Sequence, residues 1–210
     1  SDWDARECRV ARNVGQILDM LARHNTRATF FTLGWIAQRY PQLVKDIAAA
    51  GHEVASHGYG HERVSDLSEA DFEQDVLRTK ALLEDLSGRP VLGYRAPSFS
   101  IGGGNLWALD VLARTGHRYS SSIYPIQHDH YGMPDAPRFK YRTRPGLVEV
   151  PPTTLRLMNR NLPSSGGGYF RLFPYALSRW MLQQVNAREQ QSAVFYFHPW
   201  EIDPDQPRVP

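Results

Sequence analysis

Hydrophobic side chains recur along this chain with two alternating spacings, and each spacing predicts a different kind of element. Spacings of three and four residues predict amphipathic helices over residues 7–24, 35–50, 105–115 and 174–189, with a further helix that opens after Ser68. Short apolar runs bounded by glycine, proline or polar residues predict strands at residues 28–34, 52–57, 90–97, 117–123, 146–155 and 192–200. Because alternating helices and strands are typical of parallel βαβ units, the pattern predicts an α/β sheet or barrel.

Two segments depart from this alternation. Residues 124–146 are rich in Pro, His, Arg and Tyr without a clear period, which predicts a long ordered loop. Residues 164–174 predict a glycine-rich turn. The alternation also begins with a helix, whereas such folds usually begin with a strand. We therefore expect one domain over residues 1–210 that is truncated at its N-terminus and lacks its first strand.

Composition narrows the class of protein without naming a function. A chain of 210 residues with 24 Lys and Arg against 22 Asp and Glu suits one medium domain and shows no basic footprint for nucleic acid. The single cysteine, Cys8, excludes an internal disulfide framework and a cysteine-based zinc cluster. The sequence as given shows no apolar span or secretory leader, which favours the cytoplasm, although the truncated N-terminus leaves the compartment open.

Polar residues follow four of the predicted strands at the point where each strand ends. They are His57, Arg95, the three serines at residues 120–122, and His198. In parallel α/β folds the carboxyl ends of the strands form one rim, where ligands and catalytic groups collect. We therefore expect these residues to converge on one functional site.

The stretch "SHGYGH" at residues 56–61 carries two histidines four positions apart. Two interpretations are open, a metal site or a polar turn that contains imidazoles. Gly58 and Gly60 between the histidines argue against a regular helix, and position 58 lacks the Glu of the zinc-protease helix motif. The location of His57 at a strand end favours the functional interpretation.

Several motifs then appear in a fixed order. They are "RATFF", "SHGYGH", "RAPSF" at residues 95–99, and "YFHPW", which contains His198. In this order they resemble the motifs of the polysaccharide deacetylases, the NodB-homology or carbohydrate esterase family 4 group. The stretches "GYRAPSFSI", "SSSIYP", "GGGYFRL" and "HPWEIDPDQPR" are similar to the subgroup associated with exosortase and exopolysaccharide loci.

The resemblance implies a distorted (β/α) barrel that removes N-acetyl groups from an amino-sugar polymer. It implies that His57 and His61 are ligands of a divalent metal, with zinc as the expected ion and cobalt or nickel as alternatives. A metal held by three protein ligands with an open position activates water and polarises a carbonyl. His198 would then protonate the leaving amine, and Arg95 would orient a catalytic carboxylate.

The resemblance also implies a substrate-binding set. The backbone N–H of Ser98 would stabilise the oxyanion, and Tyr196 would line the acetyl pocket. Trp200 and Tyr169, with Phe170, could stack on sugar rings.

Purely structural roles stay open as alternatives for these residues. His198 could be a hydrogen-bonded histidine below the last strand, Arg95 could form a salt bridge at the rim, and the aromatic side chains could belong to the core.

Two departures from the family pattern put catalysis in doubt. The first motif, a strand that ends in Asp-x-Glu-Asp and provides a metal ligand and the general base, is absent. Asp2 and Asp4 precede the first helix and follow no strand, so we do not place them in the site. The aspartate expected before "SSIYP" is Ser120, and a hydroxyl stabilises an imidazolium less well than a carboxylate does.

The sequence thus leads to a hypothesis with two alternatives. We expect a metal-dependent N-deacetylase that acts on an N-acetylglucosamine-type exopolysaccharide and binds no nucleic acid. The first alternative is a catalytically impaired carbohydrate-binding domain with the same fold. The second is a hydrolase of a small amide, because a fold alone does not choose its substrate.

Overall fold

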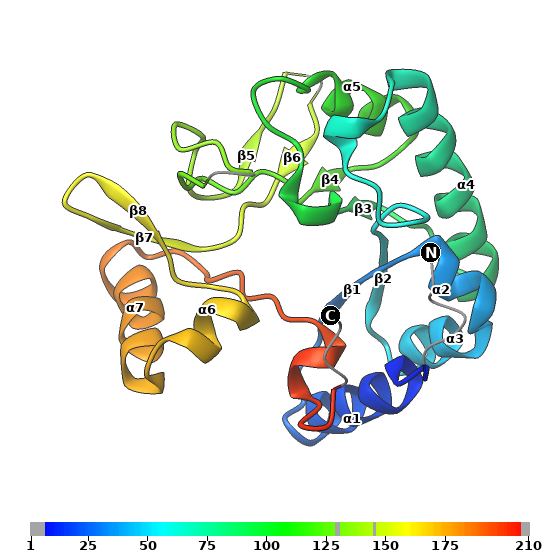
Figure 1. Cartoon of the computed structure of the whole chain (residues 1–210), viewed down its shortest axis with the longest axis horizontal. Coiled ribbons are helices and arrows are strands. Elements are labelled where there is room, and N and C mark those ends of the chain that lie inside the picture. Colours follow the sequence, from blue (N-terminus) through cyan, green and yellow to red (C-terminus); the bar gives the residue numbers. More distant parts are fainter. Residues whose placement is uncertain (1–6, 129–130, 145, 207–210) are drawn as a thin grey trace.

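The computed structural model describes residues 7–128, 131–144 and 146–206 (Figure 1). Its helices are α1 (Val10–Arg23), α2 (Gly34–Arg39), α3 (Pro41–Ala49), α4 (Glu69–Ser87), α5 (Trp107–Arg114), α6 (Gly167–Leu172) and α7 (Tyr175–Arg188). Its strands are β1 (Thr29–Thr32), β2 (Glu53–Ser56), β3 (Gly93–Tyr94), β4 (Tyr119–Ser120), β5 (Tyr141–Arg142), β6 (Val148–Glu149), β7 (Thr154–Leu157) and β8 (Arg160–Pro163). Three short 3-10 helices are η2 (Val64–Asp66), η3 (Pro97–Phe99) and η4 (Pro199–Ile202).

A six-stranded sheet in the order β1-β2-β3-β4-β6-β5 forms the centre of the molecule. All neighbouring pairs are parallel except β5 and β6, which confirms the predicted α/β fold with a parallel sheet. Figure 1 shows these strands along an arc, with α1, α3, α4 and α5 on its outer side. Within the described residues the hydrogen-bonded sheet has two edges, β1 and β5.

The outer helices bury their predicted apolar faces against this sheet. Phe72, Val76 and Leu83 of α4 are fully buried, as the spacing predicts. The helix begins where the Ser68 hydroxyl accepts a hydrogen bond from the Asp71 backbone N–H at 3.2 Å, which satisfies one of the free donors of its first turn. The core between α4, α5 and β3 therefore fixes the strands that carry the polar rim.

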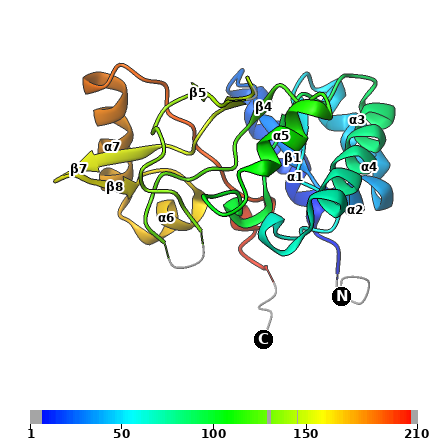
Figure 2. The same ribbon diagram turned by 90° about the horizontal axis from the view of Figure 1, so that it is seen from above.

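Residues 121–206 first add β6 and β5 to the sheet and then form a second part of the molecule beside it. The two-stranded sheet β7–β8 and helices α6 and α7 lie at the opposite end from α3 and α4 (Figure 2). Leu155, Met181 and Val185 form a small core there. Arg138 binds the Glu189 carboxylate at 2.6 Å, which joins the long loop to the end of α7.

The C-terminal segment returns to the first helix. The Asp203 carboxylate, whose side chain is fully buried, accepts hydrogen bonds from Arg9 at 2.6 and 2.9 Å. It also accepts bonds from Arg12 at 2.8 Å and from Asn13 at 3.1 Å. We call these four residues the Asp203 cluster; it ties η4 to the start of α1, as Figure 1 shows.

Several element boundaries differ from the sequence expectation. The helix predicted over 35–50 is two helices, because Pro41 lacks a backbone N–H and starts α3 instead of continuing α2. The predicted glycine-rich turn at 164–174 contains helix α6. The strand predicted over 146–155 is divided into β6 and β7 by Pro151 and Pro152, and the long loop contains the short strand β5.

The strand predicted at 192–200 is wrong. Residues 191–198 have no regular secondary structure, and η4 begins at Pro199. Successive side chains still pack on different partners, as they would in a strand. The ring of Phe195 packs on Phe170, with 5.4 Å between centroids, and the ring of Tyr196 packs on Phe99, with 5.1 Å between centroids. A strand needs a neighbour for its ladder, and within the described part of the chain this segment pairs with no strand.

No helix within the described residues is both long enough and apolar enough to cross a membrane.

Candidate active site

The strand ends of the parallel sheet lie in one row. Thr32 is in register with Ser56, Ser56 with Tyr94, and Tyr94 with Ser120. The residue after each strand continues this pattern, because its backbone N–H donates to a carbonyl of the neighbouring strand. His57 donates to Thr32, Arg95 donates to Ser56 at 2.9 Å, and residue 121 donates to Tyr94. The row therefore places His57 and Arg95 side by side at the rim, as the sequence predicted.

The two histidines of "SHGYGH" face each other. Their ring centroids are 5.2 Å apart, with 76° between the planes. The Nδ1 atom of His57 lies 2.7 Å from the Arg95 carbonyl oxygen, so the neutral ring donates from Nδ1 and keeps the lone pair of Nε2. Burial lowers the pKa of His57 to about 3 and also lowers the pKa of His61. Both rings are therefore neutral at physiological pH, the form that binds metals.

Asp75 of α4 holds the loop that carries these histidines, and sequence reasoning missed it. Its Oδ1 accepts the Tyr59 backbone N–H at 2.9 Å. The start of α2 also holds the loop, since the N–H of Gly34 bonds to the carbonyl of Gly58 at 2.9 Å. Gly58 has φ +74°, a conformation that favours glycine, and a Cβ there would lie 3.0 Å from Asp75 Oδ2. A possible signal was an Asp three residues after Phe72 on the otherwise apolar face of α4.

Two imidazoles fit part of a zinc site, because imidazole is a preferred ligand and the Arg95 carbonyl fixes the ring of His57. A third ligand is missing: within residues 7–128, 131–144 and 146–206, no three His, Cys, Asp or Glu side chains are grouped to hold a metal. Asp2 and Asp4 lie outside the described residues. The described residues therefore offer two neutral imidazoles where the family resemblance implies three ligands.

Arg95 lies half-buried at the centre of the rim. Its guanidinium donates to the Ser121 carbonyl at 3.1 Å and to the Ser121 hydroxyl at 2.7 Å. It lies over the Phe31 ring, with 4.2 Å between Cζ and the ring centroid. Burial lowers the pKa of Arg95 to about 10. No carboxylate among the described residues forms a salt bridge with it, so the alternative of a rim salt bridge finds no partner there.

A buried glutamate beside this arginine was also missed. The Glu149 side chain is fully buried, and its Oε1 accepts the backbone N–H groups of Ser122 at 2.7 Å and Ile123 at 2.9 Å. Its Oε2 has no partner among the described residues, and burial raises the pKa of this carboxyl group. The sequence signal was an acidic residue inside the apolar run "GLVEV".

Ser120 has a different role from the one expected at its position. Its hydroxyl donates to the Ser122 hydroxyl at 2.8 Å, which in turn accepts the Ala96 backbone N–H at 2.9 Å. Ser120 therefore belongs to a buried link between β4 and the Arg95 loop. None of the hydrogen bonds seen for Ser120 leads to an imidazole.

The backbone at Ser98, the predicted oxyanion donor, has an unusual conformation. Ser98 has φ 54° and Phe99 has φ 51°. Positive φ in two successive residues with side chains is costly and is held here by the surrounding turn, in which the Ser100 hydroxyl donates to the Pro97 carbonyl at 2.7 Å. Such strain is common at functional sites, and the role of Ser98 stays a prediction.

His198 lies at the start of η4 instead of at the end of a strand. Its side chain is 48% exposed and stacks on Trp200, with ring centroids 5.6 Å apart and 15° between the planes. Burial is the main cause of the lowered pKa values of His57 and His61, and the electrostatic influence of His198 acts on both in the same direction. The structure thus brings the three histidines into one electrostatic environment, although they come from distant parts of the sequence.

The predicted sugar-binding aromatics divide into two kinds. Tyr196 is half-buried, with its ring packed on Phe99 and 5.4 Å from the guanidinium carbon of Arg95. Trp200 is 44% exposed, stacks on His198 and has the guanidinium carbon of Arg171 5.0 Å from its ring centroid. Tyr169 of α6 lies 6.2 Å from Phe173. Tyr196 therefore lies against Arg95 at the rim, whereas Trp200 borders solvent.

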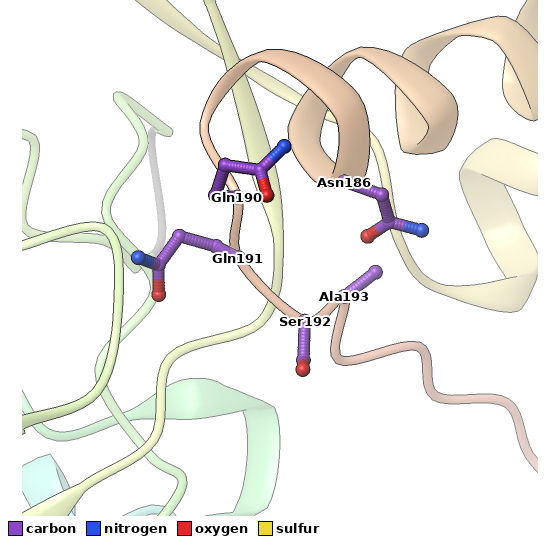
Figure 3. A pocket seen from close by; sticks show the side chains of 5 residues that line it. All are labelled: Asn186, Gln190, Gln191, Ser192 and Ala193. Atoms are coloured by element: carbon purple, nitrogen blue, oxygen red, sulfur yellow. The ribbon is translucent and has the colours of Figure 1, made fainter.

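Two cavities lie away from this rim. One of about 460 Å³ lies at the end of α7 (Figure 3) and is lined by Asn186, Gln190, Gln191, Ser192 and Ala193. The other, of about 380 Å³, lies between α1 and the α2–α3 junction. We place the candidate site at the rim because titratable groups and strand ends converge there, whereas no strand end lines either cavity.

Sequence comparison agrees with this geometry. The profile of the family described as polysaccharide deacetylase matches residues 3–120, more than half of the chain, and a domain of unknown function, DUF3473, matches residues 121–210. The chain therefore belongs to the polysaccharide deacetylase family. The two profiles meet at the end of β4, and the interpretation of residues 1–210 as one domain stays a prediction.

Curated relatives carry deacetylase names. The chain is 37% identical over 82 residues to a peptidoglycan-N-acetylglucosamine deacetylase of Bacillus cereus. The aligned part covers 39% of this chain and 30% of the relative. It is 33% identical over 110 residues to a chitooligosaccharide deacetylase of Sinorhizobium fredii, and this alignment covers 52% of this chain and 48% of the relative. The chain thus spans less than half of these relatives.

Solved structures share the fold. A protein of Mycobacterium smegmatis that is assigned to the polysaccharide deacetylases aligns with a TM-score of 0.65 and 26% identity, over 89% of this chain and 63% of that one. A CE4-family pseudoenzyme of Bacillus anthracis aligns with a TM-score of 0.56 and 17% identity, over 90% of this chain and 50% of that one. The second similarity shows the fold alone.

Proposed function

We propose that this chain is the catalytic part of a metal-dependent deacetylase that removes N-acetyl groups from an amino-sugar polysaccharide of the N-acetylglucosamine type. The observation that carries the proposal is the convergence of His57, His61, Arg95 and His198 at the carboxyl edge of the sheet. Family membership and the names of the curated relatives support the same reaction.

The reaction adds water to the acetyl carbon, breaks the C–N bond and gives acetate and a free amine. An amine anion is a very poor leaving group, so the nitrogen must gain a proton as the bond breaks. His198, half-exposed at the rim, would donate that proton. The Ser98 backbone N–H would bind the carbonyl oxygen while it carries negative charge. Tyr196 would line the acetyl pocket.

His57 and His61 would hold the metal through their neutral rings. When bound, zinc would lower the pKa of its water to ~7 and polarise a carbonyl. Cobalt or nickel would also suit imidazole ligands. The carboxylate that completes the ligand set and the carboxylate that acts as the base would both come from an Asp-bearing first motif, and Arg95 would orient the catalytic one. The hydrogen bonds of the Arg95 guanidinium go to Ser121, and it forms no ion pair with a carboxylate of the described residues although the buried Glu149 lies nearby. This supports a place for the catalytic carboxylate there.

The test is acetate release from N-acetylglucosamine oligomers in the presence of zinc, cobalt or nickel. It uses the chain alone and the chain joined to an upstream strand that ends in Asp-x-Glu-Asp. We expect release with the added strand and little without it, and loss of release in His198→Ala. Absence of acetate with every metal, from protein whose circular dichroism shows a folded chain, would contradict the proposal.

The second candidate is a carbohydrate-binding domain with impaired catalysis. The observation that favours it is the incomplete ligand set of the described residues. It predicts that the chain binds N-acetylglucosamine oligomers without releasing acetate, even with the added strand. Titration calorimetry with these oligomers, beside the acetate assay, separates the two functions.

A further inference from the structure

A histidine that transfers a proton works best when a partner fixes its ring and stabilises its cation, as carboxylates commonly do. The residue expected to do this by position is Ser120, but its hydroxyl bonds to Ser122. A different carboxylate lies beside His198. The Oε2 atom of Glu201 is 3.4 Å from the Nδ1 atom of His198.

Glu201 is fixed from three sides. Its Oε2 accepts the His198 backbone N–H at 2.8 Å, and its Oε1 lies 3.3 Å from Nη2 of Arg171. The third side is Gly167 at the start of α6, where an added Cβ would overlap the carboxylate. As a result the Glu201 side chain is only 5% exposed, which is unusual for a glutamate in a short surface helix.

We propose that Glu201 is the positioning residue of His198: it holds the imidazole in one orientation and one tautomer and stabilises its protonated form. In this arrangement Nδ1–H points to Glu201, and Nε2 is left to exchange a proton with the substrate nitrogen. Glu201 takes over the function that an aspartate at position 120 would have. The proposal depends on the proposed function only in naming His198 as the proton donor, since the contact itself is geometric.

Other groups also act on His198. Trp200 stacks on its ring and Tyr196 meets it edge-on at 6.0 Å. Positive charge comes from Arg171, whose guanidinium carbon lies 5.0 Å from the Trp200 ring centroid, and the rings of His57 and His61 share its electrostatic environment. An aromatic face attracts a cation, whereas the nearby positive charges repel it, so these groups act in opposite directions. Glu201 is the carboxylate that the described residues place against the ring.

The first experiment follows the imidazole signals of His198 by NMR during a pH titration of the metal-free chain. Unmodified protein is compared with Glu201→Gln, which keeps the size of the side chain and removes its charge. We expect the His198 pKa to fall by about one unit in the variant, because an opposite charge within ~4–6 Å favours the ionised form by that order. The nitrogen shifts should change from one defined tautomer to a mixture.

The matched control is Glu73→Gln. Glu73 forms an ion pair with Arg114 at 2.9 Å on the surface of α4, far from η4 in the fold. The same chemical change there should leave the His198 titration unmoved. Equal His198 curves and tautomers in unmodified protein and Glu201→Gln, with both folded, would overturn the proposal.

A second variant covers the case in which Glu201→Gln fails to fold. Gly167→Ala retains the carboxylate but pushes it away from its position, so a fall in the His198 pKa is expected again. Unmodified protein provides an independent check without any variant: its neutral His198 should carry the proton on Nδ1. A proton on Nε2 would overturn the proposal.

Kinetics separate this proposal from the proposed function. In a chain that releases acetate, Glu201→Gln should lower kcat by about tenfold or more with little change in KM, and should move the alkaline limb of the pH profile to lower pH by the shift seen in NMR. A chain that releases no acetate in any form contradicts the proposed function. The NMR result still decides the role of Glu201 in that case.

Discussion

Residues 7–120 and residues 121–206 contribute to the same rim in different ways. In the first region, backbone hydrogen bonds between neighbouring strands align His57 and Arg95, and a buried core of helices holds the strands. In the second region, His198 follows a segment without a strand ladder, and its position depends on side-chain contacts of Glu201 and Asp203. The large aromatic side chains that are exposed in the described chain also lie in the second region: Phe170, Tyr175, Trp180, Phe195 and Trp200.

The difference shows that one site can combine a rigid part with a part that few contacts hold. A ladder position is fixed by many hydrogen bonds, so a single surface substitution does not move it. A histidine on an irregular segment moves when one or two polar contacts are lost. We therefore expect substitutions in the first region to affect global stability and substitutions in the second to affect local order.

The largest expected effect is in the first core. Phe72→Ala removes a fully buried ring and should lower the free energy of unfolding by about 3–5 kcal/mol. Phe195→Ala, at a side chain that is 40% exposed, should cost about 1 kcal/mol or less. Urea unfolding of both variants measures the contrast, and equal losses would show that the two regions are equally packed.

The next effect concerns the histidine loop. Asp75→Ala removes the acceptor of the Tyr59 N–H, so the loop should lose its fixed geometry and zinc affinity should fall about 10–100-fold. Asp85→Ala, at an exposed position of the same helix, is the control and should bind zinc normally. Calorimetric titration with zinc gives both values. Unchanged affinity in Asp75→Ala would show that the loop is fixed without the helix.

Loss of the Asp203 cluster should release the second region locally. Asp203→Asn weakens the bonds to Arg9 and Arg12, so hydrogen exchange of the amides at 195–202 should speed up while β2 and β3 stay protected. The bond to Arg9 lowers the pKa of the Asp203 carboxyl. Its stabilisation is therefore complete above the unfolded value of about 3.9 and is lost as pH falls toward the folded value.

The same exchange experiment in acid checks that sign. Unmodified protein at a pH below about 3.9 should begin to show faster exchange at 195–202, and Asp203→Asn should show fast exchange at neutral pH as well. Protection of these amides that is equal in both proteins would mean that other contacts hold the segment.

The smallest expected effect is a dependence of the free energy of unfolding on pH that comes from Glu149. Burial raises the pKa of this carboxyl group in the folded protein, so the folded state binds more protons than the unfolded state above about pH 4.3. Stability should therefore fall as pH rises from that value through the folded pKa. Glu149→Gln, which cannot ionise, should remove this slope in urea unfolding series, and an unchanged slope would assign it to another group.

The regular part of the site was predictable from the sequence. His57 and Arg95 follow apolar runs, and because the strands are parallel their ends had to meet. Asp75, Glu149 and Glu201 were not predictable in the same way, since each acts through a contact between elements that the periodicity of one element does not reveal. The run at 192–200 has the composition of a strand, but a strand also depends on a neighbour, which a local pattern does not contain.

The bond between Arg9 and Asp203 joins residues 194 positions apart. In folding terms it closes a loop that spans nearly the whole described chain, and contacts of such high sequence separation form slowly because the chain entropy of closure precedes their gain. The strands β1 and β2, which neighbour each other in sequence, can pair much earlier. We therefore expect the histidine pair to be in place before His198 arrives. The rate at which the whole rim assembles should then follow closure of the last segment and not formation of the sheet.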